Sequence, residues 1–368
     1  PVHINMPFRE PLVPAHYSLD VPEVEVSLTA MPRTSMDERQ LLALVKSMSE
    51  KPGLILCGPG IQDKEFAAEV TRLAARLDCP VLADPLSGLR YGGHDKTRVV
   101  SHYSLFLAAD MRIESPGWII RFGAMPVSSA LQGYLAARGG RQFVVDHRGR
   151  WPDPLNQSAQ VLHASPAVLC AQLASMDLRP ARSAWCAAWV GLEKRCEQQL
   201  NSVGLELPPE ASLMRQLVSG LPDGSLLFSG NSLAIRYLDG YSGRVDRKLE
   251  VSGNRGASGI DGNISSFLGL ATAHAGQGKM AAIIGDLAFF HDMNGLAAAR
   301  GLDAVLVIIN NNGGGIFAQL PHKDLPGYQR YWRTPLDLDY GHAASLYGLP
   351  YHKLQDLGRF PGVLAQAL

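Results

Sequence analysis

The chain has 368 residues, 46% of them hydrophobic, with 34 Lys and Arg balanced by 34 Asp and Glu. This length and composition can bury a large core and predict two domains of roughly 150 residues each. Balanced charge without long runs of one sign removes the usual electrostatic case for a nucleic-acid or membrane-surface partner. No apolar stretch of about 20 residues and no signal peptide is visible, so we expect a soluble protein without a membrane span.

The five cysteines show no C-x-x-C spacing, and Cys57 lies inside the apolar run GLILC. Cysteines spread in this way are typical of buried, reduced thiols, which favours a cytoplasmic protein.

The first 35 residues differ in composition from the rest of the chain. VHINMPF alternates like a strand, and the Pro-rich stretch 9–34 has the composition of an extended linker. We therefore expect residues 1–35 to be the end of a missing N-terminal domain followed by a linker.

Residues 36–204 alternate helical patterns with short Val, Ile and Leu runs. The helix MDERQLLALVKSM precedes GLILC, and further apolar runs are CPVLA, GWIIRF, RQFVV and SAQVL. Such alternation indicates a parallel sheet with helices on both faces. We predict a central Rossmann-like domain closed by helices over 166–201.

Residues 205–368 repeat this alternation, so the fold class is α/β with two doubly wound parallel-sheet domains. A helix ASLMRQLVSGL leads to the strand SLLFS, a Gly-rich turn runs into a helix, and a strand-helix-strand unit spans 280–313. The chain stops after a helix, where this architecture requires one more strand. We therefore predict that this second domain is truncated at its C-terminus.

The unit 280–313 ends both of its strands in polar residues and glycines. Asp286 follows the first strand, and Asn311 and Gly313 follow the second. The carboxyl ends of parallel strands lie side by side, so these residues can meet. A carboxylate, an amide oxygen and a backbone carbonyl suit Mg²⁺, and the helix start favours a diphosphate as its companion. The alternative is a crossover whose strands simply end in turn-forming residues.

Three segments resemble one known family: SGNRGASGIDG (252–262), GDLAFFHDMNGL (285–296) and NNNGGGIF (310–317). Together they resemble the thiamine diphosphate-dependent enzymes, and within them the 2-succinyl-5-enolpyruvyl-6-hydroxy-3-cyclohexene-1-carboxylate synthases of menaquinone biosynthesis. The family usually has Gly after the motif Asp, whereas this chain, like those synthases, has Leu287. The resemblance covers essentially the whole chain and is weakest over 36–200.

The resemblance implies a role for each matching position. Mg²⁺ or Mn²⁺ would be bound by the Asp286 carboxylate, the Asn311 side chain and the Gly313 carbonyl. Ile260 would separate the two rings of the cofactor, unless it is simply a buried residue beside a turn. The remaining cofactor-binding residues would be Asn231, Ser232, Gly285, Leu287, Ala288 and Gly314.

The implied reaction decarboxylates 2-oxoglutarate and joins the product to isochorismate. Both substrates are dicarboxylates, which arginine forks bind well. Arg236 and Arg255 match the substrate-side arginines of the family, although each could instead form a surface salt bridge. Ser232, Ile316 and Phe317 would complete the substrate site. A homodimer or homotetramer is implied for the full-length protein.

Two departures from the family pattern matter. Ser129 stands where related chains tend to have a Lys that reaches toward substrate. The activating glutamate is expected on the missing N-terminal domain of a partner subunit, so this chain alone should be inactive. Four glutamates of this chain could be considered in its place, but their positions in the sequence indicate solvated carboxylates: Glu10, Glu23, Glu25 and Glu38.

Other features receive no catalytic role. His147 and His291 could act as acid-base groups, but neither is assigned one. The Gly58–Gly60 turn lacks the full dinucleotide-binding pattern. Two other functions stay open: another thiamine diphosphate-dependent decarboxylase or acetolactate-type synthase, and a non-catalytic binding module that retains the fold.

Overall fold

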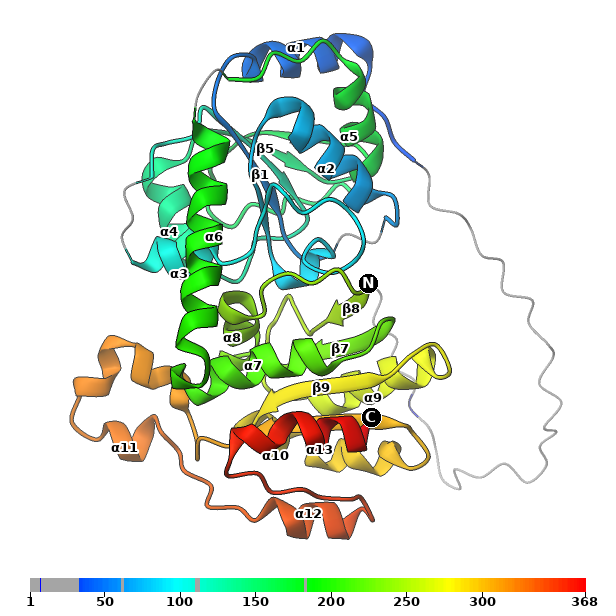
Figure 1. Ribbon diagram of the computed structural model, residues 1–368, viewed down its shortest axis with the longest axis vertical. Helices are drawn as coiled ribbons and strands as arrows, with labels where there is room; N and C mark the ends of the chain where they lie inside the picture. Colours follow the sequence, from blue (N-terminus) through cyan, green and yellow to red (C-terminus); the bar gives the residue numbers. More distant parts are fainter. Residues whose placement is uncertain (1–6, 8–32, 61–62, 110–112, 182–183) are drawn as a thin grey trace, which may run out of the picture. The chain divides into compact units, whose positions relative to one another are not determined.

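The computed structural model describes residues 7, 33–60, 63–109, 113–181 and 184–368, and its helices and strands all lie in one compact unit, residues 34–368. The strand and linker expected over residues 1–35 fall almost entirely outside the described residues. The unit contains two parallel sheets, as the sequence predicts (Figure 1).

The first sheet has six strands in the order β3-β2-β1-β4-β5-β6, and every neighbouring pair is parallel. Strand β1 is buried along its whole length because each of its faces meets a helical layer. Ile55 and Cys57 pack with α1, α2 and α5, whereas Leu54 and Leu56 pack with α3, α4 and α6. The strands are β1 (Gly53–Cys57), β2 (Val81–Ala83), β3 (Val99–Val100), β4 (Trp118–Phe122), β5 (Arg141–Val145) and β6 (Ser158–Leu162). The helices are α1 (Glu38–Met48), α2 (Phe66–Leu77), η1 (Pro85–Ser87), α3 (Tyr103–Ala108), α4 (Ser129–Arg138), α5 (Pro166–Ser175) and α6 (Trp185–Val203).

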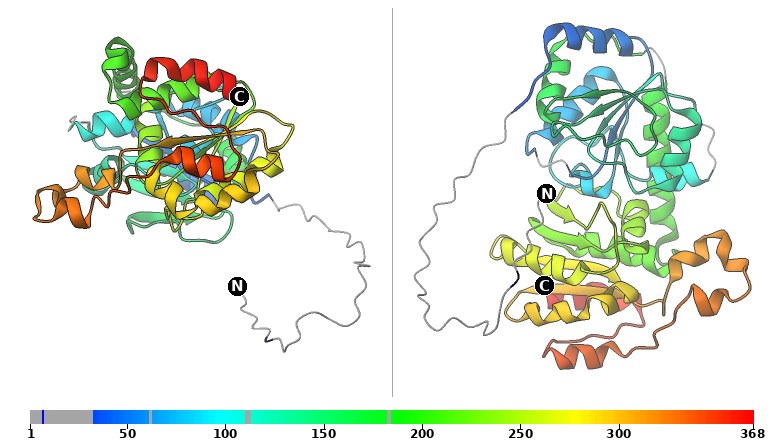
Figure 2. Two further views of the ribbon diagram at one scale, coloured as in Figure 1. Left: turned by 90° about the horizontal axis from the view of Figure 1, so that it is seen from below. Right: turned by 180° about the vertical axis from the view of Figure 1, so that it is seen from behind.

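The second sheet has four parallel strands in the order β10-β9-β7-β8. Helices α7, α8 and α13 lie on one face of this sheet, and α9, α10 and α12 lie on the other (Figures 1 and 2). Leu227 and Ile283 pack with the first layer, and Phe228 and Ile284 pack with the second. The strands are β7 (Ser225–Ser229), β8 (Leu249–Ser252), β9 (Met280–Gly285) and β10 (Ala304–Ile309). The helices are η2 (Gly204–Glu206), α7 (Pro209–Gly220), α8 (Leu233–Tyr241), α9 (Asn263–His274), α10 (Asp286–His291), η3 (Met293–Ala299), η4 (Gly315–Gln319), η5 (Pro321–Asp324), α11 (Tyr328–Tyr331), α12 (Tyr340–Leu346), η6 (Leu357–Arg359) and α13 (Phe360–Ala367).

The crossover between β9 and β10 differs from the sequence expectation. The sequence predicts a single helix within the strand-helix-strand unit 280–313, whereas the structure has the short α10 followed by the 3₁₀ helix η3. The helix breaks at Asp292, whose carboxylate accepts hydrogen bonds from the backbone and hydroxyl of Ser265. Gly295 follows three residues later and packs close to the Ser265 hydroxyl, where a Cβ atom would lie 2.7 Å from Oγ.

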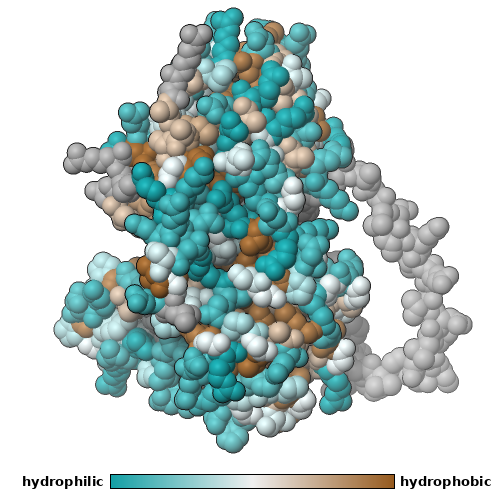
Figure 3. Space-filling model, viewed as in Figure 1, coloured by the Kyte–Doolittle hydropathy of each residue, from teal (hydrophilic) through white to brown (hydrophobic). Residues whose placement is uncertain are grey.

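Hydrophilic residues dominate the face of the molecule drawn in Figure 3, with smaller hydrophobic patches among them. Over the residues that the structure describes, we find no helix with the length and apolar character needed to cross a bilayer.

Candidate cofactor and metal site

The candidate site lies at the carboxyl ends of the strands of the second sheet, which we call the carboxyl rim. From β7 the chain moves to β8 on one side, and then to β9 and β10 on the other. Ligands of open parallel sheets bind at the carboxyl ends beside such a reversal of strand order. Asn231 follows β7, Asp286 follows β9, Asn311 follows β10 and Arg255 follows β8, so all four predicted residues lie at this rim.

The Asp286 carboxylate connects the ends of β9 and β10. The parallel register pairs Ile309 with Gly285, which brings the two following loops together. Asp286 is 3% exposed, and its Oδ2 atom accepts a hydrogen bond of 2.7 Å from the Gly313 backbone. Its Oδ1 atom accepts one of 2.8 Å from the Leu287 backbone. The two polar strand ends therefore meet, as the crossover geometry requires.

Asn311 presents an oxygen that has no partner. Its Oδ1 atom is buried and accepts no hydrogen bond in the structure, although Arg333 donates to the Asn311 carbonyl at 2.8 Å. A buried amide oxygen without a donor is costly and commonly marks the place of an ion or water. Asn311 belongs to the same loop as Gly313, which contacts the Asp286 carboxylate, and an amide oxygen of this kind suits a hard cation such as Mg²⁺.

Gly313 has a conformation that other residues rarely adopt. Its φ is +110°, and a Cβ atom there would lie 2.0 Å from the Arg333 carbonyl oxygen. Its own carbonyl accepts a hydrogen bond of 2.5 Å from the Gly315 backbone. The Gly313 carbonyl, which the sequence suggested as a free metal ligand, therefore already accepts one hydrogen bond.

The turn after β7 is held tightly. Asn231 is 2% exposed; it donates to the Gly259 carbonyl at 2.7 Å and accepts from Arg255 at 2.8 Å. Ser232 has φ 64° and ψ −126°, a strained conformation for a residue with a side chain. Strain of this kind accumulates at binding sites.

Two guanidinium groups lie at the rim without a carboxylate. Arg236 donates to the Ser232 carbonyl at 2.7 Å, and Arg255 donates to Asn231. Burial, and then the positive charge of Arg255, lower the pKa of Arg236. Within the described residues neither arginine forms an ion pair, so the surface salt bridges considered as alternatives are not seen. Neighbouring guanidinium groups without a carboxylate partner have the chemistry to bind an anion.

The apolar residues predicted for the site surround the same loops. Ile260 is half-buried and packs on the α9 side of the sheet. Ile316 and Phe317 belong to η4, and the Phe317 ring meets Trp332 edge-on at 5.2 Å. Gly314 donates to the Arg333 carbonyl at 2.6 Å. Leu287 and Ala288 form the first turn of α10.

Arg333 is a site residue that the sequence reading missed. It fixes the loop after β10 by donating to Asn311 and by accepting from Gly314. It lies 22 positions beyond Asn311, outside the quoted segments, so no local pattern signals this contact.

The corresponding position of the first sheet is closed. Strand order reverses between β1 and β4, but the Gly58 backbone donates to the Phe122 carbonyl and the Ala124 backbone to that of Pro59, both at 2.9 Å. A Cβ atom on Gly58 would lie 1.7 Å from the Ala124 oxygen. The two strand ends are therefore tightly joined at this turn.

The other residues considered from sequence lie apart from these contacts. Ser129 is the exposed first residue of α4, and Glu38 is the exposed first residue of α1. His147 follows β5 in the central domain, and His291 ends α10 with its ring against Phe290. Residues Glu10, Glu23 and Glu25 lie outside the described residues.

The described part of the chain contains no group of three or more His, Cys, Asp and Glu side chains placed to bind a metal. The set at the carboxyl rim is of another kind, because it combines one carboxylate with amide and carbonyl oxygens. The fold and this rim define a class: a doubly wound α/β protein whose candidate ligand site lies at the strand ends.

Comparison with known proteins places the chain within that class. Residues 29–229 match the family model described as "Middle domain of thiamine pyrophosphate", and residues 244–368 match "Thiamine pyrophosphate enzyme, C-terminal TPP binding domain". The chain belongs to the thiamine pyrophosphate enzymes, and thiamine pyrophosphate, also called thiamine diphosphate, is the cofactor that its second domain binds in this family.

Among similar proteins is the 2-succinyl-5-enolpyruvyl-6-hydroxy-3-cyclohexene-1-carboxylate synthase of Dechloromonas aromatica, 39% identical over 95% of this chain and 64% of its own length. The synthase of the same name from Geobacillus thermodenitrificans is 40% identical over 100% of this chain and 64% of its own length. The chain thus spans less than two thirds of these relatives.

A solved structure shows the same fold. The benzoylformate decarboxylase of Polynucleobacter necessarius superimposes with a TM-score of 0.61 at 14% identity, covering 94% of this chain and 65% of that one. At this identity the likeness concerns the fold alone.

Proposed function

We propose that this chain is part of an enzyme that decarboxylates 2-oxoglutarate and joins the product to isochorismate, giving 2-succinyl-5-enolpyruvyl-6-hydroxy-3-cyclohexene-1-carboxylate for menaquinone biosynthesis. The names of relatives near 40% identity support this reaction. The observation that carries the proposal is the meeting of Asp286 and Gly313 beside the unpartnered Asn311 Oδ1, on the same rim as Arg236 and Arg255.

Three residues would hold the metal. Asp286 and Asn311 supply side-chain oxygens, and Gly313 supplies a carbonyl whose second lone pair is not used by Gly315. Mg²⁺, or Mn²⁺ in its place, would take its other ligands from diphosphate and water. The diphosphate would lie against the backbone of Gly285, Leu287, Ala288 and Gly314 and the turn at Asn231 and Ser232.

Thiamine diphosphate, when bound, supplies the electron sink for decarboxylation. The residues of this chain would bind and orient the reactants around it. Ile260 would hold the cofactor rings in their folded arrangement. Arg236, Arg255 and Ser232 would bind substrate carboxylates through charge-assisted hydrogen bonds, and Ile316 and Phe317 would exclude water from the reacting atoms.

Two properties of the full protein belong to the proposal. An assembly of two or four copies is inferred from the resemblance to the family. A cytoplasmic location is supported by the five cysteines, which are all free and of which only Cys196 is not fully buried.

The metal role can be tested by calorimetric titration of thiamine diphosphate with Mg²⁺. Asp286→Ala should lower the affinity by at least about tenfold, because it removes the only carboxylate of the set. Asp303→Ala is the matched control, since Asp303 is exposed at the opposite end of β10 and pairs only with Lys279. Equal affinities of wild type and Asp286→Ala would refute the metal role.

The substrate class can be tested on the cofactor-loaded chain. We expect 2-oxoglutarate to bind more tightly than pyruvate, and Arg236→Ala and Arg255→Ala to remove most of that preference. Arg300→Ala is a suitable control because this exposed arginine lies at the far end of the sheet, before β10. A preference for pyruvate would favour another decarboxylase or an acetolactate-type synthase.

A further inference from the structure

The central domain extends one segment into the second domain, residues 84–91, which we call the clamp segment. It follows β2 and contains η1. Tyr91 is part of the hydrophobic core on the α7 and α8 side of the second sheet, and Leu86 packs against the same core. The Arg90 carbonyl accepts a hydrogen bond of 3.0 Å from the Val245 backbone.

Arg90 lies at the centre of this segment with 0% exposure. Its Nη1 atom donates to the Asp239 carbonyl at 2.7 Å, and its Nη2 atom donates to the Asp239 carboxylate at 2.6 Å. Its Nε atom donates to the Ala83 carbonyl at 2.7 Å. One guanidinium group therefore joins the end of β2 to the last turn of α8.

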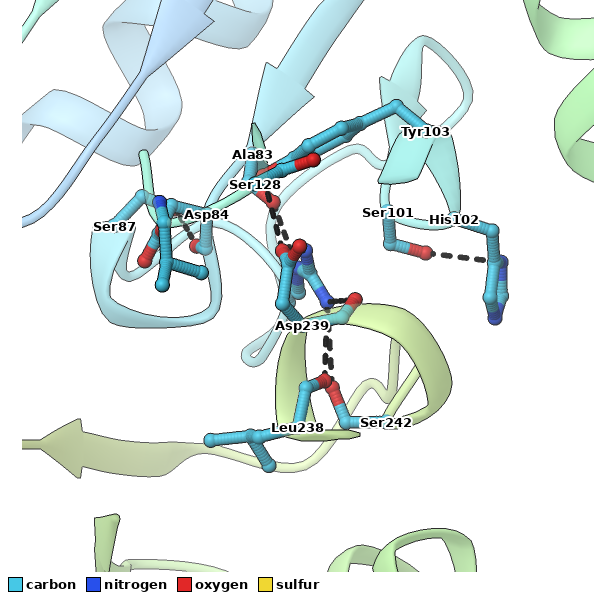
Figure 4. A network of polar contacts seen from close by, with 12 residues as sticks. Ala83, Asp84, Ser87, Ser101, His102, Tyr103, Ser128, Leu238, Asp239 and Ser242 are labelled. Atoms are coloured by element: carbon cyan, nitrogen blue, oxygen red, sulfur yellow. Dashed lines mark hydrogen bonds and ion pairs between the residues drawn. The ribbon is translucent and has the colours of Figure 1, made fainter. Parts of the chain in front are cut away.

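The contact is a helix C-cap supplied by another domain. The last carbonyls of a helix have no partner within the helix, and a positive charge near them is favourable. Arg90 satisfies the Asp239 carbonyl and lies 3.4 Å from that of Leu238. The Tyr103 hydroxyl adds a hydrogen bond of 3.0 Å to the Asp239 carboxylate. Figure 4 shows Asp239 close to Ala83 and Tyr103, with Leu238 and Ser242 on the far side of Asp239.

Both arginine-bearing segments of the carboxyl rim contact the clamp segment. Arg236 lies on α8 one turn before Asp239. Arg255 follows β8, which contacts η1, and a Cβ atom on Gly253 would lie 3.8 Å from Leu86. The rim itself offers the two arginines only the Ser232 carbonyl and Asn231. Two neighbouring like charges repel, so α8 and the loop after β8, which carry Arg236 and Arg255, gain from an anchor elsewhere.

We propose that Arg90 is a positioning residue, which fixes α8 through Asp239 so that Arg236 faces Arg255 and the two bind one dicarboxylate. The central domain thereby takes part in substrate recognition without touching substrate. This inference rests on the proposed function, because it concerns the same arginines.

The test compares two buried Arg-Asp pairs. Asp239→Asn keeps the shape and the backbone acceptor but removes the charge that Arg90 binds. Asp153→Asn is the matched control, since Arg121 and Asp153 form an equally buried pair at 3.2 Å within the central domain. Tyr103→Phe is a milder second variant, because it removes only one hydrogen bond to Asp239.

Two quantities are measured for each variant: the affinity for 2-oxoglutarate with thiamine diphosphate and Mg²⁺ present, and amide hydrogen exchange across residues 233–241 without ligand. Asp239→Asn should weaken binding at least fivefold and speed exchange in α8, with a smaller change in Tyr103→Phe. Asp153→Asn should change neither the affinity nor the exchange rate by more than twofold, including when it lowers the melting temperature as much as Asp239→Asn does.

Unchanged affinity in Asp239→Asn, or the same loss in Asp153→Asn, would overturn the positioning role. If the wild-type chain fails to bind 2-oxoglutarate, the substrate proposal is overturned instead. In that case the amide exchange rates alone test whether Arg90 fixes α8. Equal exchange rates of α8 in Asp239→Asn and in the wild type would overturn that claim as well.

Discussion

Asp84 is a carboxylate enclosed by protein, with 1% exposure. It accepts hydrogen bonds from the Leu86 backbone at 2.9 Å and the Val127 backbone at 3.2 Å. Burial, and then the negative charge of Asp239, raise the pKa of Asp84 to about 6. Arg90 opposes this rise but does not cancel it.

A pH dependence follows for this residue. A carboxyl whose pKa is raised on folding binds its proton more tightly in the native state. Its contribution to stability is therefore complete below about pH 4 and is lost as the pH rises through 6, with a limit of about 3 kcal/mol. In urea unfolding, the free energy of unfolding of Asp84→Asn relative to the wild type should rise by about that amount between pH 4 and 7. The exposed-site variant Asp303→Asn should not, and a pH-independent gap for Asp84→Asn would contradict the prediction.

Gly313 offers a second test at the level of one residue. Gly313→Ala combines an unfavourable φ of +110° with a collision at the Arg333 carbonyl. We expect a loss of about 2 kcal/mol in unfolding free energy and loss of detectable thiamine diphosphate binding. Gly276→Ala separates the two causes, because Gly276 has φ +78° but open space around it. It should lose about 1 kcal/mol and keep cofactor affinity; equal effects of both variants would argue against a shaped loop.

At the scale of elements, the sequence predicts best where burial is strong and local. Strands β1, β9 and β10 are continuous apolar runs, β4 and β5 are mostly apolar, and α1, α2 and α7 have clear helical spacing. The sequence reading missed β3, α3, α8 and β8. Strand β3 has two residues and β8 has four, so they depend on pairing with distant strands. Helix α8 carries Gly240 in its last turn and depends on a cap from Arg90, 149 positions away from Asp239.

The candidate site also contains residues whose meeting the sequence predicts and others whose contacts it does not predict. Asp286, Asn311 and Gly313 end consecutive parallel strands, so strand-helix-strand geometry predicts their meeting. The contacts of Arg333 and Arg90 join segments that are far apart in the sequence, and no periodicity reports them.

Helix α4 allows a prediction about one element. Ser128 is its N-cap and accepts a hydrogen bond of 3.2 Å from the Leu131 backbone, whereas Ser129 is exposed in the first turn. Ser128→Ala should lower the free energy of unfolding by about 1 kcal/mol, because an N-terminal amide loses its acceptor. Ser129→Ala should change it by less than about 0.5 kcal/mol. Denaturant unfolding of both variants makes the comparison, and equal losses would show that the cap contributes nothing.

At the scale of the whole unit 34–368, the two sheets are joined by shared burial. Tyr91 and Val127 come from the central domain but belong to the core formed with α7 and α8. Arg244 of the second domain donates to the carbonyls of Lys96 and Val99 in the first. Contacts of this kind favour unfolding of both domains together, since neither core is complete alone.

Glu193 is the acidic centre of this junction and should control the acid limit of the protein. It is 0% exposed, accepts from the His102 backbone at 2.9 Å and lies 3.0 Å from the His102 ring and 3.5 Å from Arg244. Burial acts to raise the pKa of Glu193, but the hydrogen bonds and charges of His102, Arg244 and Ser101 outweigh it and bring the pKa to about 2.

The sign is opposite to that of Asp84. A carboxyl with a lowered pKa stabilises the folded protein above about pH 4.5, and that stabilisation is lost as the pH falls toward 2. As the pH falls over this range, the free energy of unfolding of the wild type should drop by about 3 kcal/mol, and Glu193→Gln should not show this drop. At pH 7 the variant should be less stable by about 3 kcal/mol or more, because the neutral amide no longer balances the charge of Arg244, which is left with its more exposed pairing with Glu197. Urea unfolding between pH 2 and 7 measures both effects, and parallel curves for the two proteins would mean that Glu193 is not the group that acid protonates.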